Sequence, residues 1–335
     1  MNRQESYVDR VNAEISNFEH TLAAGGVTHS IPKMFTYWAS TYLSPRLVRI
    51  FGAADIPEIF AREILRCASA SDKRHVRILS LGSGDCEFER SVHTLLSGQV
   101  DATWSCTDLN AAVSEHAQRI ALSSPDHATR FNFHTIDLNI DFVQGQFDFI
   151  IANHSLHHFL NLEFIFDHVH RSLTKDGRFI VSDMIGRNGH MRWPEALTFV
   201  QDLWRFLPEP YRFNNHAKCI EGENFVNYDC TSNGDFEGVR AQDILPLLLD
   251  KFGFERFVGF GGVSDIFLDK AYGPNFDLGK EFDIKFIQYI AALNTALIDS
   301  GIVKPTMMIA TLSADPTQCV FDRWSPQFAL RDPTL

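Results

Sequence analysis

The chain has 335 residues, of which 45% are hydrophobic and 21% charged, and a formal net charge of −12 at pH 7. This composition is ordinary for a globular protein with a full core. The negative charge and the lack of a clustered basic stretch argue against nucleic acid as a partner. Six cysteines without a C-x-x-C pair predict reduced thiols. The sequence shows neither a signal-peptide core nor an apolar run of membrane-spanning length, so we expect a cytoplasmic protein without membrane association.

About 70 residues with helical spacing precede the first predicted strand. Tyr37, Trp38 and Tyr42 recur there as an aromatic stripe on one helix face. Such a stripe can line a substrate pocket or pack a helix onto a sheet. The sequence alone favours neither interpretation.

The segment from Val76 to Cys86 predicts a buried strand that opens into a ligand loop. Its apolar residues have the composition of a parallel strand covered on both faces. Gly82 and Gly84 then let the backbone turn sharply and approach a ligand. Helical spacing begins at Glu87, so strand, glycine turn and helix follow one another as in a nucleotide-binding unit. A G-x-G turn alone is weak support for such a site.

Acidic and polar residues follow the next three predicted strands. Asp108 ends the strand 102–107, in the place of a ribose-binding carboxylate, and Asp137 ends the strand 131–136. Because parallel strands open into one crevice at their carboxyl ends, we expect these loops to meet. The strand 147–152 ends in the sequence Asn153-His154-Ser155-Leu156-His157-His158-Phe159.

With these strands and acids, the chain resembles the class I S-adenosylmethionine-dependent methyltransferases of the small-molecule type, over about residues 75 to 185. Residues 171–183 are similar to that family's helix, glycine turn and fifth strand. The resemblance implies an α/β fold with a Rossmann-like, doubly wound sheet of seven strands, the last pair antiparallel. It also implies S-adenosyl-L-methionine as cofactor and S-adenosyl-L-homocysteine as product. Two positions depart from the family pattern: Ser80 replaces a usual acid, and Cys86 replaces a usual third glycine.

The resemblance assigns the cofactor residues one by one. It places the glycine loop against the methionine part of the cofactor, Asp108 on the ribose, and Asp137 with Leu138 on the adenine. A dehydrogenase is the nearest competitor, but its fingerprint needs glycine at Glu87, where an acid would repel a pyrophosphate. The predicted cofactor residues are Gly82, Ser83, Gly84, Asp85, Asp108, Leu109, Asp137, Leu138, Asn153 and His154.

The predicted elements divide the chain into four parts. Residues 1–72 are predicted as an N-terminal helical lid and residues 73–186 as the cofactor-binding core. Residues 187–239 are predicted as a substrate cap inserted after the fifth strand. Residues 240–335 return to the core and contain a helical insertion. Aromatic residues of the lid and cap are the predicted substrate-pocket residues: Tyr37, Trp38, Tyr42, Trp193 and Trp204.

Methyl transfer is an in-line displacement at an activated carbon, so the protein mainly aligns an acceptor and excludes water. A base is needed only where the acceptor has a proton to lose, and imidazole suits that task near neutral pH. His157 and His158 are the predicted bases, with His190 and Glu195 as further catalytic candidates. A histidine base favours O-methylation slightly over N- or C-methylation. Each of these histidines, taken alone, is more often a hydrogen-bonded structural residue than a base.

The predicted partner is a small-molecule acceptor, and 29 phenylalanines suit an apolar or aromatic one. The histidine spacing matches no zinc signature, so no metal is predicted. The sequence leaves open whether the chain forms a homodimer. Two other functions are weighed: a non-catalytic subunit that keeps the fold, against which Asp108 and Asp137 argue, and an NAD-dependent dehydrogenase.

Overall fold

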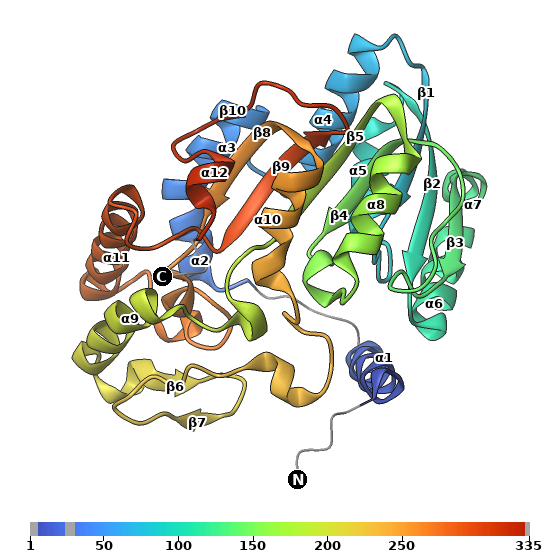
Figure 1. Cartoon of the computed structure of the whole chain (residues 1–335). Helices are drawn as coiled ribbons and strands as arrows, with labels where there is room; N and C mark the ends of the chain where they lie inside the picture. The colour runs from blue at the N-terminus through green and yellow to red at the C-terminus, as the bar shows by residue number, and fades with distance from the viewer. Residues whose placement is uncertain (1–5, 24–30, 332–335) are drawn as a thin grey trace.

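The computed structural model describes residues 6–23 and 31–331. A mixed sheet with helices on both faces forms its centre (Figure 1), and its strand order is β10-β8-β9-β5-β4-β1-β2-β3. Neighbouring strands are parallel except at β9, which runs antiparallel to β5 and β8. The strands are β1 (His75–Ser80), β2 (Asp101–Asp108), β3 (Phe131–Thr135), β4 (Phe147–Asn153), β5 (Leu173–Met184), β8 (Gly253–Phe260), β9 (Met307–Ser313) and β10 (Val320–Phe321).

The Rossmann-like sheet and its late antiparallel pair are confirmed, but the predicted number of seven strands was wrong by one. The additional strand, β10, lies beside β8 at the edge of the sheet. It consists of only Val320 and Phe321, both exposed. Two residues are too short for an alternating pattern to show in the sequence.

Helices cover the two faces of the sheet and its β3 edge. Behind the sheet in the view of Figure 1 lie α2 (Lys33–Trp38), α3 (Ser44–Phe51), α4 (Ile56–Ala70) and α5 (Glu87–Leu96). In front of it lie α8 (Leu162–Ser172), α10 (Ala241–Lys251) and α12 (Pro326–Ala329). Beside β2 and β3 lie α6 (Ala111–Leu122) and α7 (Pro125–Arg130).

Side chains of β1 alternate between two hydrophobic clusters, one on each face of the sheet. Ile78 belongs to the cluster that also contains residues of α4 and α5, whereas Leu79 belongs to the cluster with residues of α8 and α10. Both side chains are fully buried. The nearly continuous apolar run in the sequence follows from this burial on two faces.

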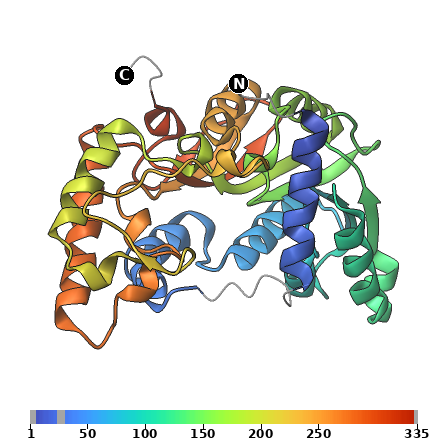
Figure 2. The same cartoon turned by 90° about the horizontal axis from the view of Figure 1, so that it is seen from below.

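Three segments gather around the carboxyl edge of the sheet. Helix α1 (Tyr7–Ala23) stands apart from the other N-terminal helices and packs along α6 (Figure 2). After β5 the chain forms α9 (Pro194–Phe206) and the hairpin of β6 (Phe213–Asn214) and β7 (Cys219–Ile220). Helix α11 (Glu281–Asp299), inserted between β8 and β9, lies beside α9 in both views (Figure 1, Figure 2).

Short turns of other helix types connect these elements. They are η1 (Ala39–Leu43), a π-helical turn, and the 3-10 turns η2 (Leu156–His158), η3 (Asn188–His190), η4 (Glu209–Arg212), η5 (Cys230–Asn233), η6 (Asp265–Phe267) and η7 (Gly273–Asn275).

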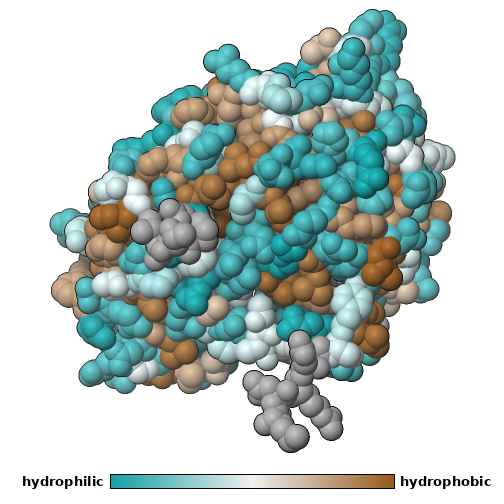
Figure 3. Space-filling model, in the orientation of Figure 1, coloured by the Kyte–Doolittle hydropathy of each residue, from teal (hydrophilic) through white to brown (hydrophobic). Residues whose placement is uncertain are grey.

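The molecular surface mixes polar and apolar side chains. On the face in Figure 3, hydrophobic side chains form several patches separated by hydrophilic ones. Scattered apolar side chains of this kind are usual on protein surfaces. Within residues 6–23 and 31–331, no helix is both long enough and apolar enough to cross a bilayer.

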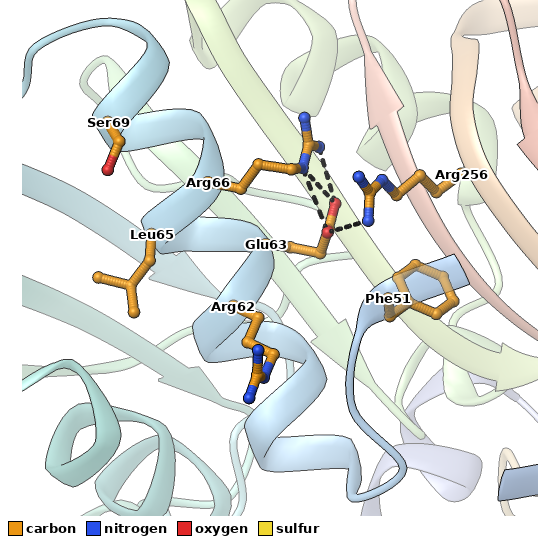
Figure 4. A pocket seen from close by; sticks show the side chains of 7 residues that line it. All are labelled: Phe51, Arg62, Glu63, Leu65, Arg66, Ser69 and Arg256. Atoms are coloured by element: carbon orange, nitrogen blue, oxygen red, sulfur yellow. Dashed lines mark hydrogen bonds and ion pairs between the residues drawn. The ribbon is translucent and has the colours of Figure 1, made fainter. Parts of the chain in front are cut away.

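A small hollow of about 340 Å³ lies against α4 and contains a network of charges (Figure 4). The buried Glu63 carboxylate accepts a hydrogen bond from Arg66 at 2.7 Å and forms an ion pair with Arg256 at 3.2 Å. It also accepts a hydrogen bond from the Thr311 hydroxyl at 2.9 Å. These contacts tie α4 to β8 and β9, so we assign the hollow a structural role.

Replacing Glu63 by glutamine tests this role. Glu63→Gln leaves two cations without their shared carboxylate, and we expect the free energy of unfolding to fall by about 3 kcal/mol. Urea titration followed by circular dichroism measures the loss. Glu58→Gln is the control, because Glu58 pairs with Arg62 on the exposed side of the same helix, where an ion pair contributes about 0.5 kcal/mol. Equal stabilities of the two variants would contradict the structural role.

Candidate active site

A cavity of about 800 Å³ lies at the carboxyl ends of β1, β2, β3 and β4. Its other lining residues include Glu14 from α1 and Phe236 from the segment after β7. The structure therefore brings the predicted loops together around one space. All ten residues that the sequence assigned to the cofactor line it: Gly82, Ser83, Gly84, Asp85, Asp108, Leu109, Asp137, Leu138, Asn153 and His154.

The glycine loop between β1 and α5 forms one wall of this cavity. Gly82 has a φ of +66°, and a Cβ there would lie 2.9 Å from the Cβ of Ser155, so the loop after β4 can approach only because residue 82 is glycine. A Cβ on Gly84, with φ of +53°, would meet no atom within 4 Å. A ligand thus has room to approach the backbone there. Cys86 keeps a φ of +59°, so the turn usual for a third glycine is retained without one.

Asp108 ends β2 and braces the glycine loop. One carboxylate oxygen accepts a hydrogen bond from the Gly84 N–H at 3.0 Å, and the other accepts one from the Asn110 N–H at 2.8 Å. A carboxylate has about four acceptor sites, so two remain for the hydroxyls of a ligand. Burial raises the pKa of Asp108 to about 6, although the two N–H groups oppose the shift.

Helix α1 closes the side of the cavity near β3. The Tyr7 hydroxyl donates to one oxygen of Asp137, and the Asn139 N–H donates to the other at 2.9 Å. Burial and the neighbouring Asp137 raise the pKa of Tyr7. The Asn110 side chain also donates to the carbonyl of Ile15 at 3.2 Å. Of the predicted lid, α1, Ile31 and Pro57 contribute residues to the cavity wall.

The loop after β4 is organised by Asp183, a fully buried residue of β5. One oxygen of its carboxylate accepts hydrogen bonds from the N–H groups of Ser155 at 2.9 Å and Leu156 at 2.7 Å. The other oxygen lies 2.6 Å from Nδ1 of His157. Burial alone would raise the pKa of Asp183, but His157 and the backbone donors hold it below its usual range. The pairing fixes the proton on Nδ1 and leaves Nε2 of His157 for other partners.

Glu237, from the segment that precedes α10, faces three histidines. Its carboxylate lies 2.5 Å from Nε2 of His190, 3.6 Å from Nε2 of His157 and 3.5 Å from Nε2 of His158. Burial opposes ionisation of Glu237, but His157 and His190 hold its pKa far below its usual range. Burial would likewise lower the pKa of His157, but Asp183 and Glu237 raise it to about 10. His157 is therefore held as an imidazolium between two carboxylates.

Two groups of side chains lie close enough to share a metal ion among the described residues. His157, His190 and Glu237 are one group, with ligand atoms within 4.8 Å of one another. Their mutual hydrogen bonds and charges also account for this proximity without an ion. The second group contains His93, whose Nδ1 accepts a hydrogen bond from the indole of Trp104 at 3.2 Å. Its Nε2 must then carry the proton and is not free to bind a metal. The expectation of no metal stays a prediction.

Glu195 and Trp193, predicted for catalysis and the substrate pocket, lie outside the cavity. The Glu195 carboxylate accepts a hydrogen bond from Arg331 at 2.8 Å, and the Arg331 guanidinium stacks 4.1 Å from the centre of the Trp193 ring. Trp204 is fully buried and donates to the carbonyl of Gly222 at 3.0 Å. Glu195 and Trp193 thus tie the segment after β5 to the C-terminal region, whereas Trp204 bonds within that segment.

The aromatic stripe of the N-terminal region also lies away from the cavity lining. Trp38 is buried in the main hydrophobic cluster, against which Tyr37 and Tyr42 pack. The Tyr37 hydroxyl accepts a hydrogen bond from Gln288 of α11 at 2.9 Å. Contact of these side chains with a substrate stays a prediction.

Sequence reasoning missed Glu89, a buried cavity residue on α5. The Ser80 hydroxyl donates to its Oε1 at 2.6 Å. Two signals were present: the family's usual acid is absent at Ser80, and Glu89 shares an inward helix face with Val92 and Leu96. No such signal pointed to Glu237, because the sequence around it has neither helical nor strand periodicity.

Residues 79–179 match a family model described as a methyltransferase domain. Trichosetin synthetase PKS-NRPS1 of Gibberella fujikuroi is 33% identical over 111 residues, which are 32% of this chain and 3% of that protein. The non-reducing polyketide synthase subA of Metarhizium robertsii is 25% identical over 198 residues, 52% of this chain and 9% of that protein. The chain thus matches only a small part of these curated relatives.

The solved structures to which this chain is similar share little of its sequence. The [4+2]-cyclase SpnF is 12% identical with a TM-score of 0.44, covering 92% of this chain and 96% of its own. The O-methyltransferase from a trans-AT PKS multienzyme of Brevibacillus brevis, in complex with S-adenosyl-L-homocysteine, is 13% identical with a TM-score of 0.41. That comparison covers 95% of this chain and 83% of the other.

The matched domain and the observed sheet define the class of this protein. Residues 79–179 form a methyltransferase domain, and the sheet that contains them has the order and the late antiparallel strand of class I. Residues 79–179 thus carry a class I S-adenosylmethionine-dependent methyltransferase domain. Its cofactor is S-adenosyl-L-methionine.

The titration of Asp108 predicts how cofactor binding depends on pH. Because its pKa is raised to about 6, the carboxylate is present above that pH and is protonated below it. We expect the affinity for S-adenosyl-L-homocysteine to fall as the pH drops through about 6, and Asp108→Asn to weaken binding about 10- to 100-fold at neutral pH. Calorimetry across this range measures both effects. A variant that binds as tightly as the wild type would contradict the assignment of Asp108.

Proposed function

We propose that this chain transfers a methyl group from S-adenosyl-L-methionine to a small-molecule acceptor from which a proton must leave. The observation that carries the proposal is the buried pair of Asp183 and His157, placed directly behind residues that line the cofactor cavity. Methyl transfer needs a base only for an acceptor that carries such a proton. A buried carboxylate that holds one imidazole tautomer is the arrangement expected for a general base.

The residues of the cavity suggest how the cofactor is held. Gly84 leaves room for the backbone to approach it, and Asp108 has acceptor sites for ribose hydroxyls. Asp137 and Leu138 lie at the β3 end of the cavity, where adenine binding is expected from the resemblance. When bound, the cofactor supplies an electrophilic methyl carbon attached to a sulfonium. An acidic loop with Asp85 and Glu87 suits this cation better than it would suit a pyrophosphate.

His157 is the general base of this proposal. Asp183 accepts the Nδ1 hydrogen bond and so orients the ring, while Nε2 points toward Glu237 and the cap segment. The acceptor would therefore enter between the cofactor cavity and the segment that carries Glu237. Because two carboxylates raise the pKa of His157 to about 10, only a minor fraction of it is the neutral base near pH 7. That fraction grows as the pH rises, so the rate of methyl transfer is expected to rise with it. His158 and His190 contact the same Glu237 carboxylate and help to hold it near His157.

The acceptor is proposed to be a largely apolar molecule with an acidic hydroxyl. Phe159 and Phe236 line the cavity and offer apolar surface. A phenol or enol oxygen would give its proton to His157, so O-methylation is favoured over N- or C-methylation. A second candidate is C-methylation of a 1,3-dicarbonyl compound, since an enolate carries charge on both oxygen and carbon. The names of the partial relatives, which are polyketide synthases, favour acceptors of this kind.

Replacing the base tests the mechanism. His157→Ala is expected to keep the affinity for S-adenosyl-L-homocysteine and to lower the methyl-transfer rate about 100- to 10,000-fold. The assay uses deuterated S-adenosyl-L-methionine with a β-diketone, a phenol and an amine, and mass spectrometry identifies the methylated atom. His116→Ala, on α6 outside the cavity lining, is the control. Cofactor binding without turnover of any acceptor by the wild type would instead favour the non-catalytic subunit.

The charge of His157 can be measured directly. We expect ¹⁵N spectra of the imidazole to show both ring nitrogens protonated at neutral pH, because Asp183 and Glu237 raise the pKa to about 10. Glu237→Gln removes one of these carboxylates, so the pKa of His157 should fall and the rising limb of the rate profile should move to lower pH. An unchanged pKa in this variant would show that Glu237 does not face Nε2.

A further inference from the structure

Glu89 carries an unsatisfied acceptor in the wall of the cofactor cavity. The side chain is 3% exposed, and its Oε1 accepts the hydrogen bond from Ser80 at 2.6 Å. Its Oε2 is buried and has no hydrogen-bond partner among the described residues. A buried carboxylate without a full set of partners is costly, since charge is removed from water without compensation. Such an atom beside a cavity points to a hydrogen-bond donor on a ligand.

The position of Glu89 indicates which end of the ligand it meets. Ser80 ends β1 and lies two residues before Gly82, so Glu89 lies at the root of the glycine loop. Along the edge of the sheet, Asp108, proposed for the ribose, ends the neighbouring strand β2, and Asp137, proposed for the adenine, follows β3 one strand further from β1. Glu89 is therefore at the end assigned to the methionine part of the cofactor. That part carries an α-ammonium group in addition to its carboxylate and sulfur.

We propose that Glu89 binds the α-ammonium group of the cofactor through Oε2, with Ser80 holding Oε1. The inference rests on the proposed cofactor site and adds to it a residue that the glycine-loop pattern does not contain. Ser80 stands at the strand end where the resemblance leads one to expect an acid. In this chain the acid lies instead on the following helix, as Glu89, in contact with Ser80. An ammonium group has three donors and a full charge, so it satisfies both the orphan oxygen and the buried charge.

The surroundings of Glu89 are consistent with a cationic ligand. Burial is the main cause that raises the pKa of this carboxyl to about 7, and Asp85 adds to the shift while Ser80 and Arg90 oppose it. Without a cation beside it, this carboxyl takes up a proton near neutral pH, and a bound cation would replace that proton. A water molecule could satisfy Oε2 as well, but it would not distinguish ligands with and without an ammonium group.

Calorimetric titration with three nucleosides distinguishes an ammonium group from a sulfonium or a water molecule as the partner of Oε2. S-adenosyl-L-methionine has the ammonium and the sulfonium, S-adenosyl-L-homocysteine has only the ammonium, and 5′-methylthioadenosine has neither. We expect Glu89→Gln to weaken the first two about 10- to 100-fold and to leave 5′-methylthioadenosine unchanged, since a charged hydrogen bond is lost only with the first two. Binding of 5′-methylthioadenosine also shows that the variant is folded. Glu115→Gln, an exposed acid of α6 outside the cavity lining, is the control for loss of charge alone and should have a much smaller effect.

Each outcome decides the proposal. Equal affinities of wild type and Glu89→Gln for S-adenosyl-L-homocysteine would overturn it, as would an equal loss in Glu115→Gln. A loss confined to S-adenosyl-L-methionine would assign Glu89 to the sulfonium and overturn the ammonium contact. If Glu89→Gln does not fold, the exchange variant Ser80→Asp/Glu89→Ser keeps one buried acid and should still prefer S-adenosyl-L-homocysteine over 5′-methylthioadenosine. Loss of that preference would overturn the proposal. A wild type that binds none of the three would instead refute the cofactor site itself.

Discussion

The buried carboxylate of Asp183 is the contact on which the site depends. It lies near the carboxyl end of β5, where it fixes the backbone of the neighbouring loop through two N–H groups and orients the imidazole of His157. Ser155, held in this way, leaves space for residue 82 only if that residue is glycine. One carboxylate on β5 thus sets the distance between the loop that carries the proposed base and the loop proposed to hold the cofactor. The positions of the two loops therefore depend on the same carboxylate.

The balance of charge around the cavity gives a second constraint. Glu14, Asp108 and Glu89 contribute carboxylates to its wall, and Glu237 lies at its cap side. The lining of the cavity is therefore rich in acidic side chains. A cofactor with a sulfonium and an ammonium group is attracted to such a wall, whereas a ligand with phosphates would be repelled. The acidic site thus favours the methyl-donor cofactor over a dinucleotide.

The sheet could be predicted because strands covered on both faces leave long apolar runs, as Val76 to Leu81 shows. The cofactor loops could be located because parallel strands place their carboxyl ends at one edge, and all ten predicted residues line one cavity there. β10 and the β6–β7 hairpin escaped prediction, since two-residue strands have no measurable period.

The substrate side was less predictable for physical reasons. A helical stripe of aromatic residues has the same spacing whether it faces a core or a pocket, and Trp38 faces the core. The contact between Glu195 and Arg331 joins residues far apart in the chain, and no local sequence pattern indicates it. Glu237 lies in an irregular segment, so only the three-dimensional structure brings it to His157. The sequence placed Asp183 at the end of a predicted strand, but it did not indicate that Asp183 pairs with His157.

The central claim is that the cavity at the carboxyl edge binds a sulfur nucleoside and not a dinucleotide. Calorimetric titration of the full chain with S-adenosyl-L-homocysteine and with NADH, carried out in parallel, tests it most directly. The account predicts saturable micromolar binding of S-adenosyl-L-homocysteine and no heat of binding with NADH. Binding of NADH, or of neither compound, would contradict it.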